Sequence, residues 1–101
     1  MVKVALYVRL EAKPGKEQEV ADFLAACLDM AAFETTTPIW FALKLSPTTF
    51  GIFDAFTSEA DRQAHLHGDI ARALMAHADD LLATPPIIES IDVLGAKNQR
   101  P

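Results

Sequence analysis

The sequence predicts a two-layer α+β domain in which helices cover one face of an antiparallel sheet. Three observations support this prediction. Four short apolar segments, the first of which alternates with polar residues, are typical of strands, two longer segments carry apolar residues at helical spacing, and turn-forming residues separate them. The chain has 101 residues, which predicts a single domain over residues 1–101.

The first strand is expected over residues 2–12, where every second residue is apolar. Pro14 and Gly15 end this strand, and Pro14 also suits the first turn of a helix. A helix is expected over residues 16–32 because its apolar residues are spaced three and four apart. These residues are Val20, Phe23, Leu24, Cys27, Leu28 and Ala31. Cys27 lies in the middle of this stripe, which favours a buried apolar role over a nucleophilic one.

The second half of the chain repeats the pattern with a hairpin first. Strands are expected over residues 39–45 and 49–56, joined by a short turn at Ser46 and Pro47. Ser58 is a predicted N-cap, with Asp61 three positions later, and the helix it opens continues to Leu82 with a bend near Gly68. The last strand is expected over residues 87–96, followed by a polar tail over residues 97–101.

The order of elements is strand, helix, strand, strand, helix, strand. This split βαβ repeat is the ferredoxin-like arrangement, in which both helices lie on one face of a four-stranded antiparallel sheet. The opposite face should alternate to polar residues where it meets water. Here it does not, because both faces are largely apolar. On the strand over residues 39–45, one face carries Ile39, Phe41, Leu43 and Leu45, and the other carries Trp40 and Ala42.

Two apolar faces on one sheet require two covers. The helices are one cover, and the same face of a second copy is the simplest second cover. We therefore expect a homodimer formed through the sheet face. A monomer with a functional apolar patch is the alternative.

Charge and composition exclude several classes of function. The formal net charge is −5, and the nine Lys and Arg residues are scattered, which argues against nucleic-acid binding and against anionic membrane surfaces. One cysteine permits neither an internal disulfide nor a cysteine-based metal cluster. The N-terminus does not resemble a signal peptide, and no segment has the roughly 20 apolar residues of a membrane span. These features predict a cytoplasmic protein that handles small neutral molecules.

Three segments resemble the antibiotic biosynthesis monooxygenase (ABM) family. They are Lys-Pro-Gly-Lys-Glu at 13–17, the aromatic strand and acidic turn that lead to Ala-His at 64–65, and the terminal segment at 86–97. The resemblance implies a dimeric α+β barrel of two ferredoxin-like subunits, with a pocket between sheet and helices. It also implies oxidation of a small phenolic or quinol-like substrate by O₂, without metal, flavin or other cofactor.

His65 is the candidate general base, because histidine titrates near neutral pH and because it matches the Ala-His of the family. A surface or structural histidine is the alternative. On an unbroken helix His67, not His65, would share the apolar stripe of the helix. A bend at Gly68 would change this phase. The stripe consists of Ala60, Ala64, Ala71, Leu74 and Ala78.

Two aromatic residues complete the candidate catalytic set. Tyr7 and Trp40 each combine a ring with a polar group that can bind a ligand, and packing is the alternative role for both. Strand alternation allows both to share the face that meets the second copy. The candidate substrate-binding residues are Phe53, Asp54 and Arg62. Asp54 interrupts an apolar face, with Arg62 as a possible partner or substrate clamp and a solvated helix charge as the alternative for Arg62.

The haem-degrading branch of the family has a different residue pattern. It carries an Asn on the first strand, a Trp on the second helix, and an axial His ten residues further on. This sequence has no Asn in its first strand, and His65 and Met75 occupy the other two positions. The competing functions are therefore a cofactor-free monooxygenase, a non-catalytic dimer that binds a small apolar molecule, and a structural dimer.

Overall fold

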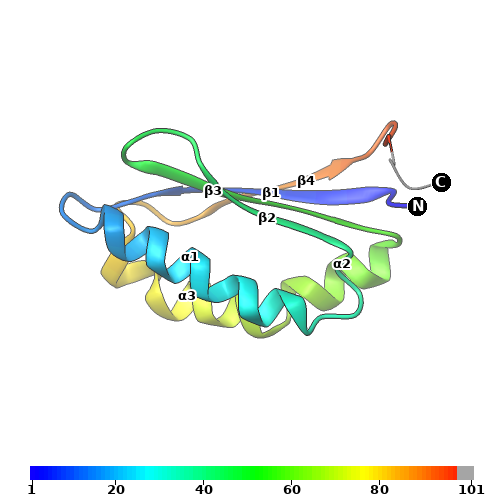
Figure 1. Cartoon of the computed structure of the whole chain (residues 1–101), viewed down its shortest axis with the longest axis horizontal. Coiled ribbons are helices and arrows are strands. Elements are labelled where there is room, and N and C mark those ends of the chain that lie inside the picture. The colour runs from blue at the N-terminus through cyan, green and yellow to red at the C-terminus, as the bar shows by residue number, and fades with distance from the viewer. Residues whose placement is uncertain (98–101) are drawn as a thin grey trace.

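The computed structural model describes residues 1–97. Three helices and four strands follow one another along the chain (Figure 1). In order they are β1 Val4–Glu11, α1 Glu17–Ala32, β2 Ile39–Lys44, β3 Thr49–Phe56, α2 Glu59–Leu66, α3 Asp69–Leu81 and β4 Ile87–Asp92. None of the described helices has both the length and the apolar composition that crossing a bilayer requires.

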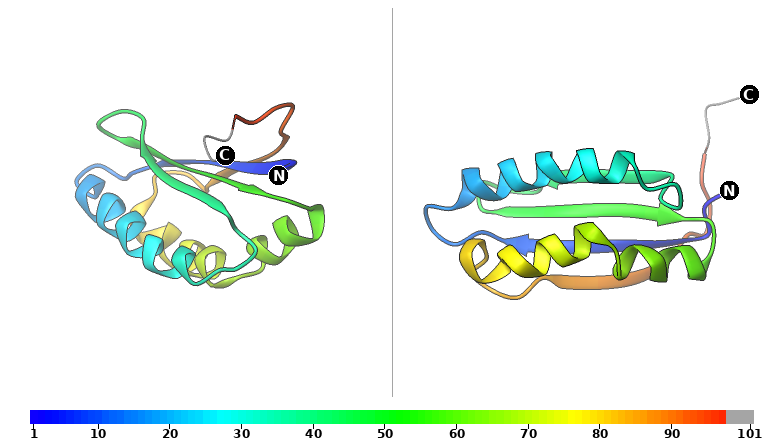
Figure 2. Two further views of the ribbon diagram at one scale, coloured as in Figure 1. Left: turned by 45° about the vertical axis from the view of Figure 1, so that its right-hand side comes forward. Right: turned by 90° about the horizontal axis from the view of Figure 1, so that it is seen from below.

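The four strands form one antiparallel sheet in the order β2-β3-β1-β4. All three helices lie beneath the same face of this sheet, and the other face carries no helix (Figures 1 and 2). This is the predicted α+β, ferredoxin-like architecture. The strands differ from the prediction at their ends: β1 is shorter at both ends, β2 stops one residue earlier, and β4 ends at Asp92. Residues 98–101 of the expected polar tail lie outside the described residues.

The core lies between the sheet and the helices. Even-numbered residues of β1 and β3 face the helices, because Leu10 pairs with Phe50 and Val8 with Ile52 across the strands, and all four are buried. From α1, Val20, Leu24 and Cys27 pack beneath them. Cys27 is fully buried, which confirms its assignment to the core, and this burial raises the pKa of its thiol to about 11.

The second helical segment is broken into two helices, where the sequence predicted one bent helix. Gly68 adopts an extended conformation (φ −92°, ψ −171°) between α2 and α3. A Cβ added at Gly68 would lie 3.3 Å from the carbonyl oxygen of His65, so the chain packs tightly at this break. The break resets the helical phase. His65 is consequently buried and His67 is exposed, which is the opposite of what the periodicity of an unbroken helix predicts.

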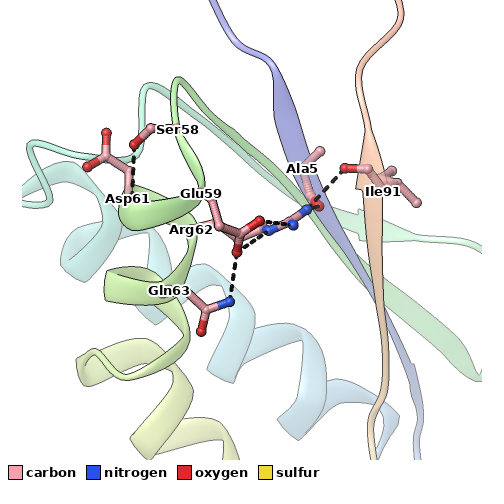
Figure 3. Close-up of polar contacts among 7 residues, drawn as sticks. All are labelled: Ala5, Ser58, Glu59, Asp61, Arg62, Gln63 and Ile91. Atoms are coloured by element: carbon pink, nitrogen blue, oxygen red, sulfur yellow. Dashed lines mark hydrogen bonds and ion pairs between the residues drawn. The ribbon is translucent and has the colours of Figure 1, made fainter.

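The start of α2 follows the prediction. The backbone N–H of Asp61 donates to the hydroxyl oxygen of Ser58 at 3.1 Å, which makes Ser58 the N-cap. One turn later, Arg62 points toward the sheet and not toward solvent (Figure 3). Its Nη1 donates to the carbonyl oxygens of Ala5 on β1 and Ile91 on β4, at 3.2 Å each.

Glu59 holds the other side of the guanidinium group through an ion pair (Figure 3). Arg62 therefore does not pair with Asp54, which was one possible role for it, and the default expectation of a solvated helix charge is wrong. Arg62 is only 9% exposed because its long side chain lies between α2 and the strand pair β1–β4. Its charged hydrogen bonds join the helix layer to the sheet.

Arg62→Met should therefore destabilise the fold by about 1.5–3 kcal/mol, the usual contribution of hydrogen bonds from a charged group. Urea unfolding followed by circular dichroism measures this loss. Arg72→Met is the matched control, because Arg72 forms an exposed ion pair with Asp69 and its loss should change the stability by less than about 0.5 kcal/mol. Equal losses in the two variants would contradict the anchoring role of Arg62.

Candidate active site

The imidazole ring of His65 lies between two carboxylates from distant parts of the chain. Its Nδ1 lies 2.7 Å from Oε1 of Glu34, and its Nε2 lies 2.9 Å from Oδ2 of Asp54. Glu34 belongs to the loop that follows α1, Asp54 to β3 and His65 to α2. Carboxylates accept hydrogen bonds, so this arrangement favours the imidazolium form of His65, which donates from both ring nitrogens.

The surroundings favour the protonated form of His65. Burial alone lowers its pKa, but the hydrogen bonds and the negative charges of Asp54 and Glu34 outweigh burial and raise the pKa above the ordinary value of 6.5. Thr37 supports the arrangement, because its hydroxyl donates to Oε1 of Glu34 at 2.7 Å and lies 3.4 Å from Nδ1 of His65. The ring of Phe56 covers the imidazole, with 5.3 Å between the ring centroids.

Asp54 has one carboxylate oxygen that is not used. The residue is 1% exposed, and while Oδ2 binds His65, Oδ1 has no hydrogen-bond partner among residues 1–97. A buried acceptor without a partner costs about 1–3 kcal/mol. Buried polar atoms without a partner are rare in native folds, so Oδ1 of Asp54 is a candidate contact for a further polar group or a water molecule.

A cavity of about 40 Å³ adjoins this pair. Its walls are apolar apart from Asp54 and His65, and they come from the sheet and from α2 and α3: Leu6, Val8, Ile52, Leu66, Ile70, Ala71, Leu74 and Ile88. The volume holds about three water molecules. Ile88 is the least buried of the named walls at 47% exposure, and it lies on the edge strand β4. Residues 1–97 contain no cluster of three or more His, Cys, Asp or Glu side chains suited to a metal ion.

The structure separates the predicted site residues into two groups. Asp54 and Trp40 are directly paired across β3 and β2, so both share the helix-facing side of the sheet with His65 beneath them. Tyr7 pairs with Phe53, and both lie on the opposite, helix-free face of the sheet. There the ring of Phe53 stacks on that of Phe41, with 6.5 Å between the ring centroids. The expectation that Tyr7 and Trp40 share a face is wrong. Tyr7 pairs with Phe53 and Trp40 pairs with Asp54, and these two neighbours on β3 point to opposite faces of the sheet.

Sequence reasoning missed Glu34 and Thr37. Both belong to the segment between α1 and β2. Their local pattern carries no catalytic signal, since they meet His65 only through contacts spanning 31 and 28 residues. The remaining predicted site residue, Arg62, lies on the same helix as His65 but binds backbone carbonyls.

Solved structures share this fold. A Nitrosomonas europaea protein named "Putative antibiotic biosynthesis monooxygenase" matches with a TM-score of 0.80 at 17% identity, over 91% of this chain and 90% of its own. Rv0793 from Mycobacterium tuberculosis matches with a TM-score of 0.82 at 15% identity, over 95% of this chain and 99% of its own. The class is thus a ferredoxin-like α+β protein with the fold of antibiotic biosynthesis monooxygenases, which confirms the expected likeness at the level of fold.

A much nearer relative defines the family. NE2512 from Nitrosomonas europaea, a protein of unknown function, is 58% identical over 100% of this chain and 98% of its own, with a TM-score of 0.96. The chain belongs to the family of this protein. No protein-family model and no curated protein matches the chain.

The raised pKa of His65 predicts a pH-dependent stability. Protonated His65 stabilises the fold fully below the unfolded-state value of 6.5, and this contribution is lost as the pH rises through the higher folded-state pKa. The free energy of unfolding should therefore fall over this interval in the wild type but not in His65→Gln. Urea unfolding at a series of pH values from about 6 to 9 measures both profiles.

His67→Gln is the control for this experiment, because it removes an exposed histidine from the end of the same helix. Its pH profile should follow the wild type. A wild-type slope that persists in His65→Gln would show that other groups cause the pH dependence.

Proposed function

We propose that the protein is a cofactor-independent monooxygenase that oxidises a small phenolic or quinol-like substrate with O₂. The observation that carries this proposal is the unpartnered Oδ1 of Asp54, a residue whose other oxygen binds His65 and which lines an apolar cavity. A basic atom in a dry, apolar site is what removal of a phenolic proton requires. The shared fold with structures named as monooxygenases is consistent with it.

The proposed chemistry uses the substrate itself as the reductant. A phenol that loses its O–H proton becomes an electron-rich anion, which passes an electron to O₂. One oxygen atom then becomes a second carbonyl of a quinone product, replacing a ring hydrogen, and the other leaves as water. The phenol and O₂ together supply every atom and electron of the quinone and water.

The roles of the residues follow from their contacts. Both nitrogens of His65 are occupied by carboxylates, so His65 cannot be the base that the sequence suggests. The proton of the substrate goes to Asp54 Oδ1, and His65 positions this carboxylate. The positive charge of His65 stabilises the substrate anion that forms when the phenol loses its proton. Glu34 and Thr37 hold the ring of His65 in place.

We further propose that the active form is a homodimer in the cytoplasm, joined through the helix-free face of the sheet. This face exposes apolar side chains that a monomer would leave in water, including Phe41 at 56%, Ile91 at 38% and Ile87 at 56%. A second copy in a twofold arrangement would cover them. The reducing cytoplasm would keep Cys27 as a free thiol.

Phe41→Glu should abolish this dimer, because it places a charge within the proposed apolar interface. Sedimentation equilibrium at micromolar concentration should give the mass of a dimer for the wild type and of a monomer for the variant. Phe33→Glu is the matched control, since Phe33 is 87% exposed at the end of α1 in the helix layer. A monomeric wild type, or dissociation by both substitutions, would overturn the proposed interface.

The oxygenase proposal predicts saturable O₂ consumption by metal-free protein with a member of a panel of quinols and naphthols. Asp54→Asn and His65→Gln should each lower kcat about 10²–10⁴-fold, the usual contribution of a general base. His67→Gln should keep the wild-type rate, and circular dichroism should verify the fold of every variant. An oxygen electrode makes the measurement.

Two outcomes would contradict the proposal. Full activity in Asp54→Asn and His65→Gln would show that Asp54 is not the base and that His65 does not position it. No uptake above autoxidation across the panel would favour the non-catalytic alternatives, a dimer that binds a small molecule or a structural dimer.

A further inference from the structure

The cavity between the sheet, α2 and α3 is too small for the proposed aromatic substrate. It measures about 40 Å³, whereas pockets that hold drug-sized ligands measure roughly 300–1,000 Å³. Apart from Asp54 and His65, its walls are aliphatic side chains such as those of Leu6, Ile52 and Ile70. A diatomic molecule fits this space, and an aromatic ring does not.

The two polar walls of the cavity have little hydrogen-bonding capacity left. Nδ1 of His65 lies against Glu34, and its Nε2 lies against Oδ2 of Asp54. Oδ1 of Asp54 is the one unused side-chain atom that these two walls offer among residues 1–97. A buried water molecule typically makes about three hydrogen bonds, so a water molecule in the cavity would lack partners. We therefore expect the cavity to be dry.

We infer that this cavity is a binding site for molecular oxygen. O₂ is diatomic and uncharged, and it dissolves better in apolar media than in water. Apolar walls therefore hold it through dispersion contacts, with no hydrogen bond required. Dry apolar cavities in proteins take up xenon for the same reason. The inference rests on the proposed function for the use of the bound gas, but not for its binding.

The position of His65 gives the bound gas a chemical role. His65 is a wall of the cavity, and its two carboxylate contacts favour the imidazolium form. When a phenolate passes one electron to O₂, the phenolate becomes a phenoxyl radical and O₂ becomes the superoxide anion. A positive charge at the wall stabilises superoxide but not neutral O₂, so it favours this transfer. In the proposed order of events Asp54 already carries the phenolic proton, so its own charge no longer opposes the anion.

A small gas can enter the cavity past the edge strand β4. Ile88 on this strand is a wall of the cavity and is 47% exposed, whereas the walls Leu6, Ile52 and Ile70 are deeply buried. Exposed side chains change rotamer within picoseconds to nanoseconds. Rotation of the Ile88 side chain is therefore a sufficient opening for O₂.

O₂ is paramagnetic, so its effect on methyl protons tests the site directly. Methyl ¹H–¹³C spectra of the wild type are recorded under O₂ pressure and, as the diamagnetic reference, under N₂ at the same pressure. O₂ should relax the methyl protons of Ile52 and Ile70 several-fold more strongly than those of Leu10 and Leu24, which are as deeply buried but do not line the cavity. Uniform relaxation across the core would overturn the O₂ site, and so would cross-peaks between water and the cavity methyl groups.

Ala71→Leu is the matching variant, because Ala71 is a wall of the cavity on α3 and a leucine side chain there takes up its space. The excess relaxation of Ile52 and Ile70 should be lost. Ala76→Leu is the control, since Ala76 is exposed on the same helix and does not line the cavity. Excess relaxation that persists in a folded Ala71→Leu would place the gas elsewhere and overturn the inference. The wild-type comparison decides by itself if Ala71→Leu does not fold.

The result is separable from that of the oxygenase assay. Selective relaxation of the cavity methyl groups without O₂ consumption across the substrate panel would retain the gas site and contradict the oxygenase. O₂ consumption by a protein whose core relaxes uniformly would retain the oxygenase and refute the gas site. Where both hold, Ala71→Leu should raise KM for O₂ several-fold and leave KM for the phenolic substrate nearly unchanged.

Discussion

The contact on which the rest of this structure depends is the buried imidazolium of His65 between Glu34 and Asp54. Each of the three residues comes from a different segment, and the two hydrogen bonds join the loop before β2, the centre of β3 and the helix α2. Burying ionisable groups such as His65 and Asp54 is costly unless each is paired. The pairing here is complete for His65 and incomplete for Asp54. The hydrogen bonds of His65 thus stabilise the cluster, while Oδ1 of Asp54 remains without a partner among residues 1–97.

The break at Gly68 makes this cluster possible. On a continuous helix, His67 would lie on the same face as the buried residues Ile70 and Leu74, and His65 would face solvent. With the break, α2 follows its own phase and buries Arg62 and His65, one turn apart. Arg62 fastens the helix to β1 and β4, and His65 meets β3. The position of the imidazole is therefore set by two contacts of α2 with the sheet, one through Arg62 and one through His65 itself.

The fold was largely predictable from sequence because its signals are local. Alternation over β1, the short turn between β2 and β3 and the Ser58 cap each depend on residues close in the chain, and the structure agrees with them. The site was predictable only in part. His65, Trp40 and Asp54 were singled out by residue type, but their meeting depends on strand register and on the helix break. Glu34 reaches His65 across 31 residues, a contact that no local pattern encodes.

The alternation of β3 has a consequence for how this family can evolve. Phe53 and Asp54 are neighbours in the chain but serve opposite faces of the sheet, one apolar and helix-free, the other facing the helices. Substitutions can be accepted on either face independently. An insertion or deletion of one residue within β3 cannot be accepted in this way, because it would exchange the side chains of the two faces. Asp54 would then lie on the helix-free face and Phe53 on the face that meets the helices. Length variation in this family should therefore be confined to the loops, while the strand at the centre keeps its residue count.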